Sequence, residues 1–117
     1  MVDRVLIVAR TSEGNIPQIA KLFAESDSTD LPALLGVRNR SLFAYRDLYF
    51  HFVEFDGDHR AALARAAGRE DFRELSRQLR PLVDPYDPAT WRSPADALSH
   101  EFYTWTPQSG PEVRDQK

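Results

Sequence analysis

Residues 34–55 read LLGVRNRSLFAYRDLYFHFVEF, and within them two aromatic-rich runs stand on either side of Arg46 and Asp47. Aromatic and β-branched residues favour strands, so these runs predict a β-hairpin that turns at this dipeptide. The predicted cross-strand pairs are Tyr45 with Leu48, Leu42 with His51, and Arg40 with Val53. Because Arg-Asp is not a favoured turn dipeptide, a three-residue loop with a bulge is the alternative. Such a loop would shift the pairs but keep the alternation within each strand.

Both faces of this predicted hairpin carry large apolar side chains, because side chains alternate across a strand. One face would hold Arg40, Leu42, Ala44, Tyr49, His51 and Val53. The other would hold Ser41, Phe43, Tyr45, Leu48, Phe50 and Phe52. We therefore expect helices to cover one face of the sheet and a second copy of the chain to cover the other, which predicts a homodimer.

The segments outside the hairpin complete a sheet with helices. Periodicity and capping residues predict a strand at 4–10, a helix at 16–25, helices at 59–67 and 71–80, and a last strand at 101–105. We expect a loop at 26–32 and a proline-containing connection at 84–99. This order predicts an α+β, ferredoxin-like βαββαβ fold, with a four-stranded antiparallel sheet and helices on one face. Residues 1–106 would form a single domain, and 107–117 a flexible C-terminal tail.

Composition excludes several classes of protein. The chain has 117 residues, is 42% hydrophobic and contains no cysteine, which excludes a disulfide scaffold, a thiol nucleophile and a cysteine zinc site. A net charge of −3 is not that of a nucleic-acid-binding protein. No apolar run is long enough to span a membrane, and the N-terminus lacks the features of a signal peptide, so we expect a cytoplasmic protein. Dense histidine spacing is absent, and we expect no metal site.

The candidate chemistry lies in Asp27, Arg40 and His51. Arg40 and His51 share one predicted face of the hairpin, and Asp27 lies in the preceding segment that leads into the sheet. A histidine can transfer protons near neutral pH, and an arginine can stabilise negative charge on an enolate or alkoxide oxygen. Leu42, Tyr49 and Val53 would line an apolar cavity around them. The competing interpretation is a structural Arg–His pair, with Asp27 serving only as a helix-end or turn residue.

Four stretches of the sequence together resemble the TcmI-type polyketide cyclase family. They are residues 23–32 (FAESDSTDLP), 36–43 (GVRNRSLF), 47–51 (DLYFH) and 102–105 (FYTW). The resemblance covers most of residues 1–106. It implies a dimeric α+β barrel and a cofactor-independent aldol cyclisation with dehydration of a poly-β-ketone or a partly cyclised aromatic intermediate. It also places Asp27, Arg40 and His51 in the pocket of the family.

The sequence departs from the family at Ser26, where the best-known member carries a histidine. If that histidine shares the proton transfer, His51 or Asp27 must do more of it in this chain, or the substrate and the ring closed must differ. Ser26 remains a candidate substrate-binding residue. Two other functions stay open, namely a cofactor-free monooxygenase of the same fold and a non-catalytic partner that folds the nascent chain within a type II polyketide synthase.

Overall fold

The computed structural model describes residues 2–91 and 94–114. Its main sheet is antiparallel and has the strand order β2-β3-β1-β4. The strands are β1 (Asp3–Thr11), β2 (Val37–Tyr45), β3 (Leu48–Phe55) and β4 (Val83–Pro85). This order is that of a ferredoxin-like sheet, and it confirms the predicted fold class.

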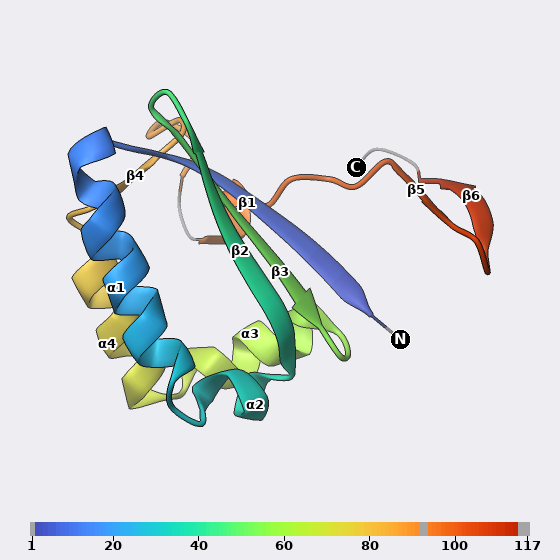
Figure 1. Ribbon diagram of the computed structural model, residues 1–117, viewed down its shortest axis with the longest axis horizontal. Helices are drawn as coiled ribbons and strands as arrows, with labels where there is room; N and C mark the ends of the chain where they lie inside the picture. The colour runs from blue at the N-terminus through green and yellow to red at the C-terminus, as the bar shows by residue number, and fades with distance from the viewer. Residues whose placement is uncertain (1, 92–93, 115–117) are drawn as a thin grey trace.

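The helices lie on one side of this sheet, as predicted (Figure 1). They are α1 (Ile16–Asp27), α2 (Leu31–Leu35), α3 (His59–Ala67) and α4 (Glu70–Leu79). Two short 3₁₀ turns, Glu13–Asn15 and Pro94–Ala97, connect elements. Within the described residues, no helix combines the length and the apolar character needed to cross a membrane.

The β2–β3 hairpin has the predicted two-residue turn and the predicted register. Leu42 pairs with His51, and Arg40 pairs with Val53. Arg46 adopts a φ of 56°, in the left-handed region that an L-residue rarely occupies. Asp47 offsets this cost through its contacts with β1, because its carbonyl accepts from the Thr11 amide at 3.0 Å and its carboxylate accepts from Arg10 at 2.6 Å.

Between α1 and β2, the predicted loop at 26–32 is too long. Helix α1 continues to Asp27, and α2 begins at Leu31. Pro32 lies in the first turn of α2, where its missing N–H has no helical partner to lose. Leu31 and Leu35 are buried, and Gly36 ends the helix at a φ of 75°. The burial of Leu31 and Leu35 depends on tertiary packing. The turn-forming residues before them therefore predict a loop and give no indication of this short helix.

A strand does form near the predicted 101–105, at Tyr103–Thr106, but the expectation that it is the fourth strand of the main sheet was wrong. The fourth strand of the main sheet is β4, which lies at the start of the segment predicted to be a connection. It pairs with the end of β1, and its Pro85 is compatible with an edge position, where one side of the strand makes no ladder bonds. Three residues that include a proline carry too little periodicity to be recognised as a strand.

The C-terminal residues form a separate hairpin of β5 (Tyr103–Thr106) and β6 (Gly110–Val113). Figure 1 shows this hairpin standing away from the sheet and its helices. Strand β6 falls inside the segment expected to be a flexible tail, so part of that segment has regular structure. Residues 115–117 of the same segment lie outside the described residues.

The core is divided into three small clusters, and no large side chain among the described residues is fully buried. The clusters are centred on Val53 and Phe55, on Phe23 and Tyr49, and on Leu31 and Leu35. A well-packed domain of this size normally joins such clusters into one core. The division reflects an open cavity between the sheet and the helices.

Candidate functional site

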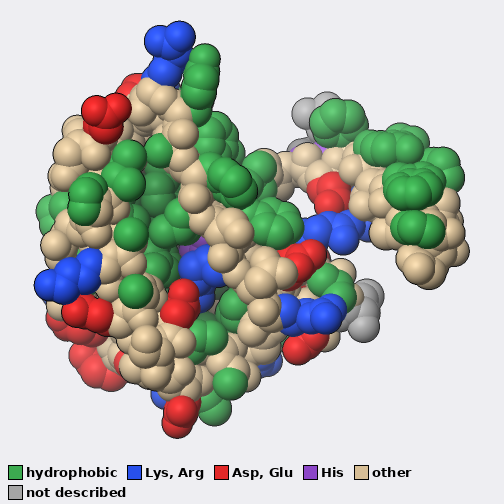
Figure 2. Space-filling view, viewed as in Figure 1, with side chains coloured by type: hydrophobic (Ala, Val, Ile, Leu, Met, Phe, Trp, Pro, Cys, Tyr) green, Lys and Arg blue, Asp and Glu red, His purple; other side chains and the backbone are tan. Residues whose placement is uncertain are grey.

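A cavity of about 600 Å³ lies between the inner face of the sheet and the helices. Its walls are mainly apolar side chains from all four strands of the main sheet and from α1 to α4. Figure 2 shows the hollow from one side, with a histidine and a basic side chain visible within it. This volume and lining suit a flat apolar molecule bound by a few polar groups.

Asp27 and Arg40 form a bidentate ion pair at the side of this cavity. Arg40 donates through Nε to Asp27 Oδ2 at 3.0 Å and through Nη2 to Asp27 Oδ1 at 2.9 Å. Asp27 is the last residue of α1, and Arg40 lies on β2. The pair therefore joins a helix end to an edge strand, and two parallel hydrogen bonds fix the plane of the guanidinium.

The third nitrogen of the Arg40 guanidinium, Nη1, contacts His51. The Arg40 Nη1 atom lies 2.9 Å from His51 Nε2. Arginine is always a donor, so Nε2 must accept this hydrogen bond, and the proton of the neutral ring must lie on Nδ1. Burial lowers the pKa of His51 to about 3, with a further contribution from the positive charge of Arg40. His51 is thus a neutral imidazole throughout the physiological pH range.

Phe23 on α1 completes this constellation from the helix side. Its ring meets the His51 ring edge-on at a centroid distance of 5.1 Å, and the Arg40 guanidinium lies 5.0 Å from its centroid. Phe23 lies within the helix predicted at 16–25, but it was not among the candidate site residues. The helical spacing gave no sign that its ring would contact both polar residues, because that contact depends on how α1 packs on the sheet.

The other candidate residues are divided between the cavity and its surroundings. Ser26, Tyr49 and Val53 line the cavity. Leu42 packs against the cluster around Phe23 and Tyr49, and it is not one of the cavity-lining residues. Asp27 is likewise absent from the lining and is joined to it through its ion pair with Arg40. The cavity thus brings together Ser26, Arg40, Tyr49, His51 and Val53.

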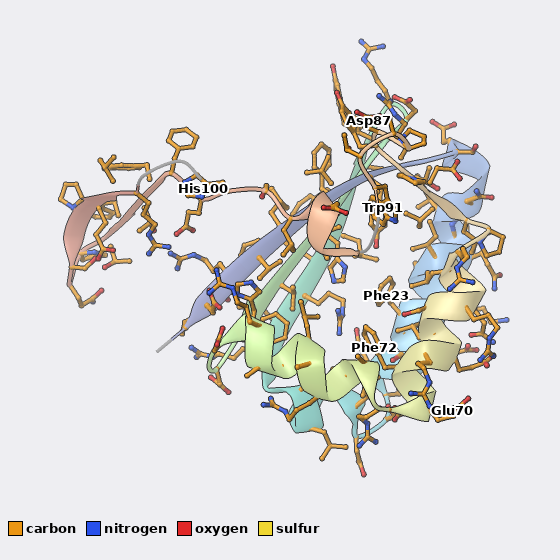
Figure 3. The ribbon with its side chains drawn as sticks, turned by 180° about the vertical axis from the view of Figure 1, so that it is seen from behind. Phe23, Glu70, Phe72, Asp87, Trp91 and His100 are labelled. Carbon is orange, nitrogen blue, oxygen red and sulfur yellow. The ribbon has the colours of Figure 1, made fainter. Side chains whose placement is uncertain are left out.

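The segment after α4 contributes cavity residues that the sequence analysis missed. Arg80, Asp84 and Trp91 line the cavity. Figure 3 shows Phe23 and Trp91 in the space between the sheet and the helices. A tryptophan in a proline-rich segment was a sequence feature that could have indicated a role for Trp91. Its place at the cavity, however, depends on the pairing of this segment with β1 through β4.

Asp3, Asp58 and His59 form a second polar cluster, with potential ligand atoms within 4.8 Å of one another. Each already has a role in the fold. Asp58 caps α3 by accepting from the Arg60 amide at 2.9 Å, and Asp3 accepts from both the amide and the ring of His59. These bonds tie the start of β1 to the start of α3, which is sufficient explanation for the cluster.

The Asp27–Arg40–His51 arrangement can stabilise negative charge on an oxygen. A guanidinium in an apolar cavity interacts with an anionic oxygen more strongly than it would in water. The adjacent neutral imidazole has a lone pair that can accept a proton once the guanidinium releases it. These properties suit a reaction that passes through an enolate and an alkoxide.

Comparisons with known proteins identify the family to which this chain is similar. A family model described as "Polyketide synthesis cyclase" matches residues 3–106. The chain is 45% identical over 100 residues to "Polyketide synthase CurG" of Streptomyces cyaneus, which covers 86% of this chain and 94% of that protein. It is 36% identical over 106 residues to "Tetracenomycin F2 cyclase" of Streptomyces glaucescens, which covers 91% and 96%.

A solved structure is similar to most of this fold. It is that of the tetracenomycin F2 cyclase of Streptomyces glaucescens, described as a type-II polyketide cyclase. The TM-score is 0.83 at 36% identity, and the match covers 89% of this chain and 97% of the other. An uncharacterized protein of Streptomyces coelicolor is 52% identical over 101 residues, covering 86% and 91%.

Proposed function

Because this chain belongs to the polyketide synthesis cyclase family, we propose that it catalyses the cofactor-independent aldol cyclisation, dehydration and aromatisation of a poly-β-ketone or partly cyclised intermediate. The proposal places the chain in bacterial aromatic (type II) polyketide biosynthesis. The observation that carries it is the position of Arg40, which lies between Asp27 and His51 at the side of a largely apolar cavity.

The first step is removal of a proton from a methylene group between two carbonyls. Such a proton is already acidic, so a weak base is sufficient when the enolate is stabilised. In the free protein, the Arg40 N–H occupies the His51 lone pair. When a substrate oxygen takes up that N–H, Nε2 becomes free to accept the methylene proton. The negative charge of the enolate then offsets the charge of Arg40 and raises the proton affinity of His51.

Ring closure follows from the same groups. The enolate carbon attacks a second carbonyl carbon, and the alkoxide that forms takes the proton back from the His51 imidazolium. Arg40 stabilises the alkoxide, and loss of water then leads to the aromatic ring. Asp27 holds the guanidinium in place through its two hydrogen bonds. Much of the rate would come from folding the reactive chain in one way, because the cavity excludes other arrangements.

Ser26 lines this cavity where the family resemblance places a histidine. Among the described residues, His51 is the one histidine that lines the cavity. A serine hydroxyl can donate to a substrate oxygen but is too weakly basic to remove the methylene proton. Ser26 is therefore proposed to contact substrate, and the proton transfer falls to His51, while Asp27 holds Arg40 in position.

The outer face of the sheet supports the proposal that two chains form the working unit. Phe43 and Tyr45 are 57% and 60% exposed on that face, and Phe43 pairs across the hairpin with Phe50. Apolar side chains gathered on one face of a sheet are typical of an interface. The proposed partner there is a second copy of the chain. A transient contact with type II polyketide synthase components is also proposed, because such components would deliver the substrate.

The experiment that tests the function replaces Arg40→Met and His51→Gln separately. Each variant is assayed with a reconstituted type II synthase that supplies the poly-β-ketone, and the products are separated and quantified. Loss of the cyclised product in both folded variants supports the roles assigned here. Wild-type products at the wild-type rate from both would contradict them.

Two further measurements separate the alternative functions. Oxygen uptake with an anthrone-type substrate would indicate a monooxygenase. A changed product ratio only in the presence of the synthase, without turnover of an isolated intermediate, would indicate a non-catalytic folding partner.

A further inference from the structure

Tyr49 has an unused polar group at the cavity. The residue is only 6% exposed, and it is one of the residues that line the cavity. Its hydroxyl has no hydrogen-bond partner among the residues that the structure describes, and no fully buried side-chain oxygen or nitrogen among them is left without one. The hydroxyl therefore keeps some accessible surface, and the cavity is the space from which a partner can approach.

Tyr49 lies close to His51 because both residues belong to β3. Tyr49 and His51 are two residues apart on β3, so their side chains share the cavity face. Their ring centroids are 6.4 Å apart. Burial raises the pKa of Tyr49 to about 12, against an opposing effect of the Arg40 charge, so the phenol remains protonated and can donate.

We propose that Tyr49 is a specificity-determining residue whose hydroxyl donates a hydrogen bond to a substrate oxygen next to the one that Arg40 binds. This inference rests on the proposed function, because a poly-β-ketone carries an oxygen on every second carbon. Two donors at different points along the cavity can hold two such oxygens at once. Holding the second oxygen fixes which carbonyl lies beside Arg40 and His51, and hence which ring closes.

The test for the hydroxyl uses two probes that differ only in oxygen acceptors. Anthraquinone-2-sulfonate has two ring carbonyls, and anthracene-2-sulfonate has none. Binding of both is measured by calorimetry for the wild type, for Tyr49→Phe and for the control Tyr45→Phe, whose side chain is 60% exposed on the opposite face. Since one neutral hydrogen bond contributes modestly, Tyr49→Phe should reduce the preference for the quinone about three- to tenfold. Tyr45→Phe should leave it within about twofold.

Several outcomes would overturn the inference. They are an unchanged quinone preference in Tyr49→Phe, an equal loss in Tyr45→Phe, and a wild type that binds the quinone no better than the hydrocarbon. The hydroxyl has no partner among the described residues, so Tyr49→Phe should melt at the wild-type temperature. If that variant fails to fold, 3-fluorotyrosine at position 49 keeps the ring and makes the hydroxyl a stronger donor. It should then increase the quinone preference, and no increase would contradict the proposal.

A second readout separates this inference from the proposed function. In the synthase assay, Tyr49→Phe should shift the ratio of cyclised products, whereas the control Tyr45→Phe should keep the wild-type ratio. If Tyr49→Phe loses the quinone preference but the wild type shows no cyclase activity, the donor role of Tyr49 stands and the proposed function is contradicted. Normal cyclase activity with an unchanged product ratio and an unchanged quinone preference would retain the function and contradict the role of Tyr49.

Discussion

Arg40 donates a hydrogen bond from Nη1 to Nε2 of His51 over 2.9 Å, so the basic atom of this cavity-lining histidine is occupied by a cation. A histidine held in this way is a poor base until something else takes up the guanidinium. A substrate oxygen is such a group. In the proposed mechanism, this contact would couple oxygen binding to proton abstraction, and the nearby positive charge of Arg40 disfavours protonation of the imidazole.

The depressed pKa of His51 predicts a specific dependence of stability on pH. In the unfolded chain, this histidine should titrate near its ordinary value of about 6.5, whereas in the folded protein it titrates at about 3. Between these values the unfolded state binds more protons, so stability should fall as the pH is lowered from 6.5 towards 3 and should gain nothing from His51 above 6.5. The contribution between pH 6.5 and 5 is about 2 kcal/mol.

Chemical denaturation at pH 7, 6 and 5 measures this effect. His51→Gln should show a smaller loss of stability over that range than the wild type. His100→Gln changes an exposed histidine and should keep the wild-type slope. Equal slopes in the wild type and His51→Gln would show that His51 is not held neutral by the fold.

Asp27→Asn should lower the cyclase rate without abolishing it. The change removes the charge of the carboxylate that accepts two hydrogen bonds from Arg40, so the guanidinium loses its fixed orientation. A positioning effect of this kind corresponds to a decrease of about tenfold to a hundredfold in kcat. Glu25→Gln removes an exposed charge from the same helix and serves as the control. Equal kcat values in the two variants would assign Asp27 a structural role.

Asp58→Ala should destabilise the fold without affecting the cavity. The Asp58 carboxylate caps α3 by accepting from the Arg60 amide at 2.9 Å. Loss of such a cap costs about 1 kcal/mol. Asp58→Asn retains an acceptor and should recover most of the stability in the same denaturation measurement. An alanine variant as stable as the wild type would argue against the cap.

Phe43→Glu should convert a dimer into a monomer if the outer face of the sheet is the interface. Phe43 is 57% exposed and lies on the face opposite the cavity. A buried unpaired carboxylate at its position would strongly oppose association. Sedimentation velocity measures the change, and Leu34→Glu, at a residue 50% exposed in α2, is the control. A monomeric wild type, or a dimer that survives Phe43→Glu, would contradict this interface.

Local pattern was sufficient for the central part of the fold. The register of the hairpin, with Leu42 opposite His51, follows from two alternating runs separated by a two-residue turn, and it needs no knowledge of distant residues. The start of α3 follows in the same way from Asp58 before an alanine-rich segment. Residue type and alternation also put Arg40 and His51 on one face, since neighbouring strands in a known register leave little freedom.

Other features depend on contacts between segments that are distant in sequence. Strand β4 is a strand because the end of β1 pairs with it, and α2 is a helix because Leu31 and Leu35 are buried. The same holds for the chemistry. Three features arise from packing α1 against the sheet around an open cavity: the low pKa of His51, the contact of Phe23 with its ring, and a Tyr49 hydroxyl that lacks a partner in the described part of the chain. Amino-acid order supplies the groups and their faces, whereas burial and distance, which set their electrostatics, exist only once the layers have assembled.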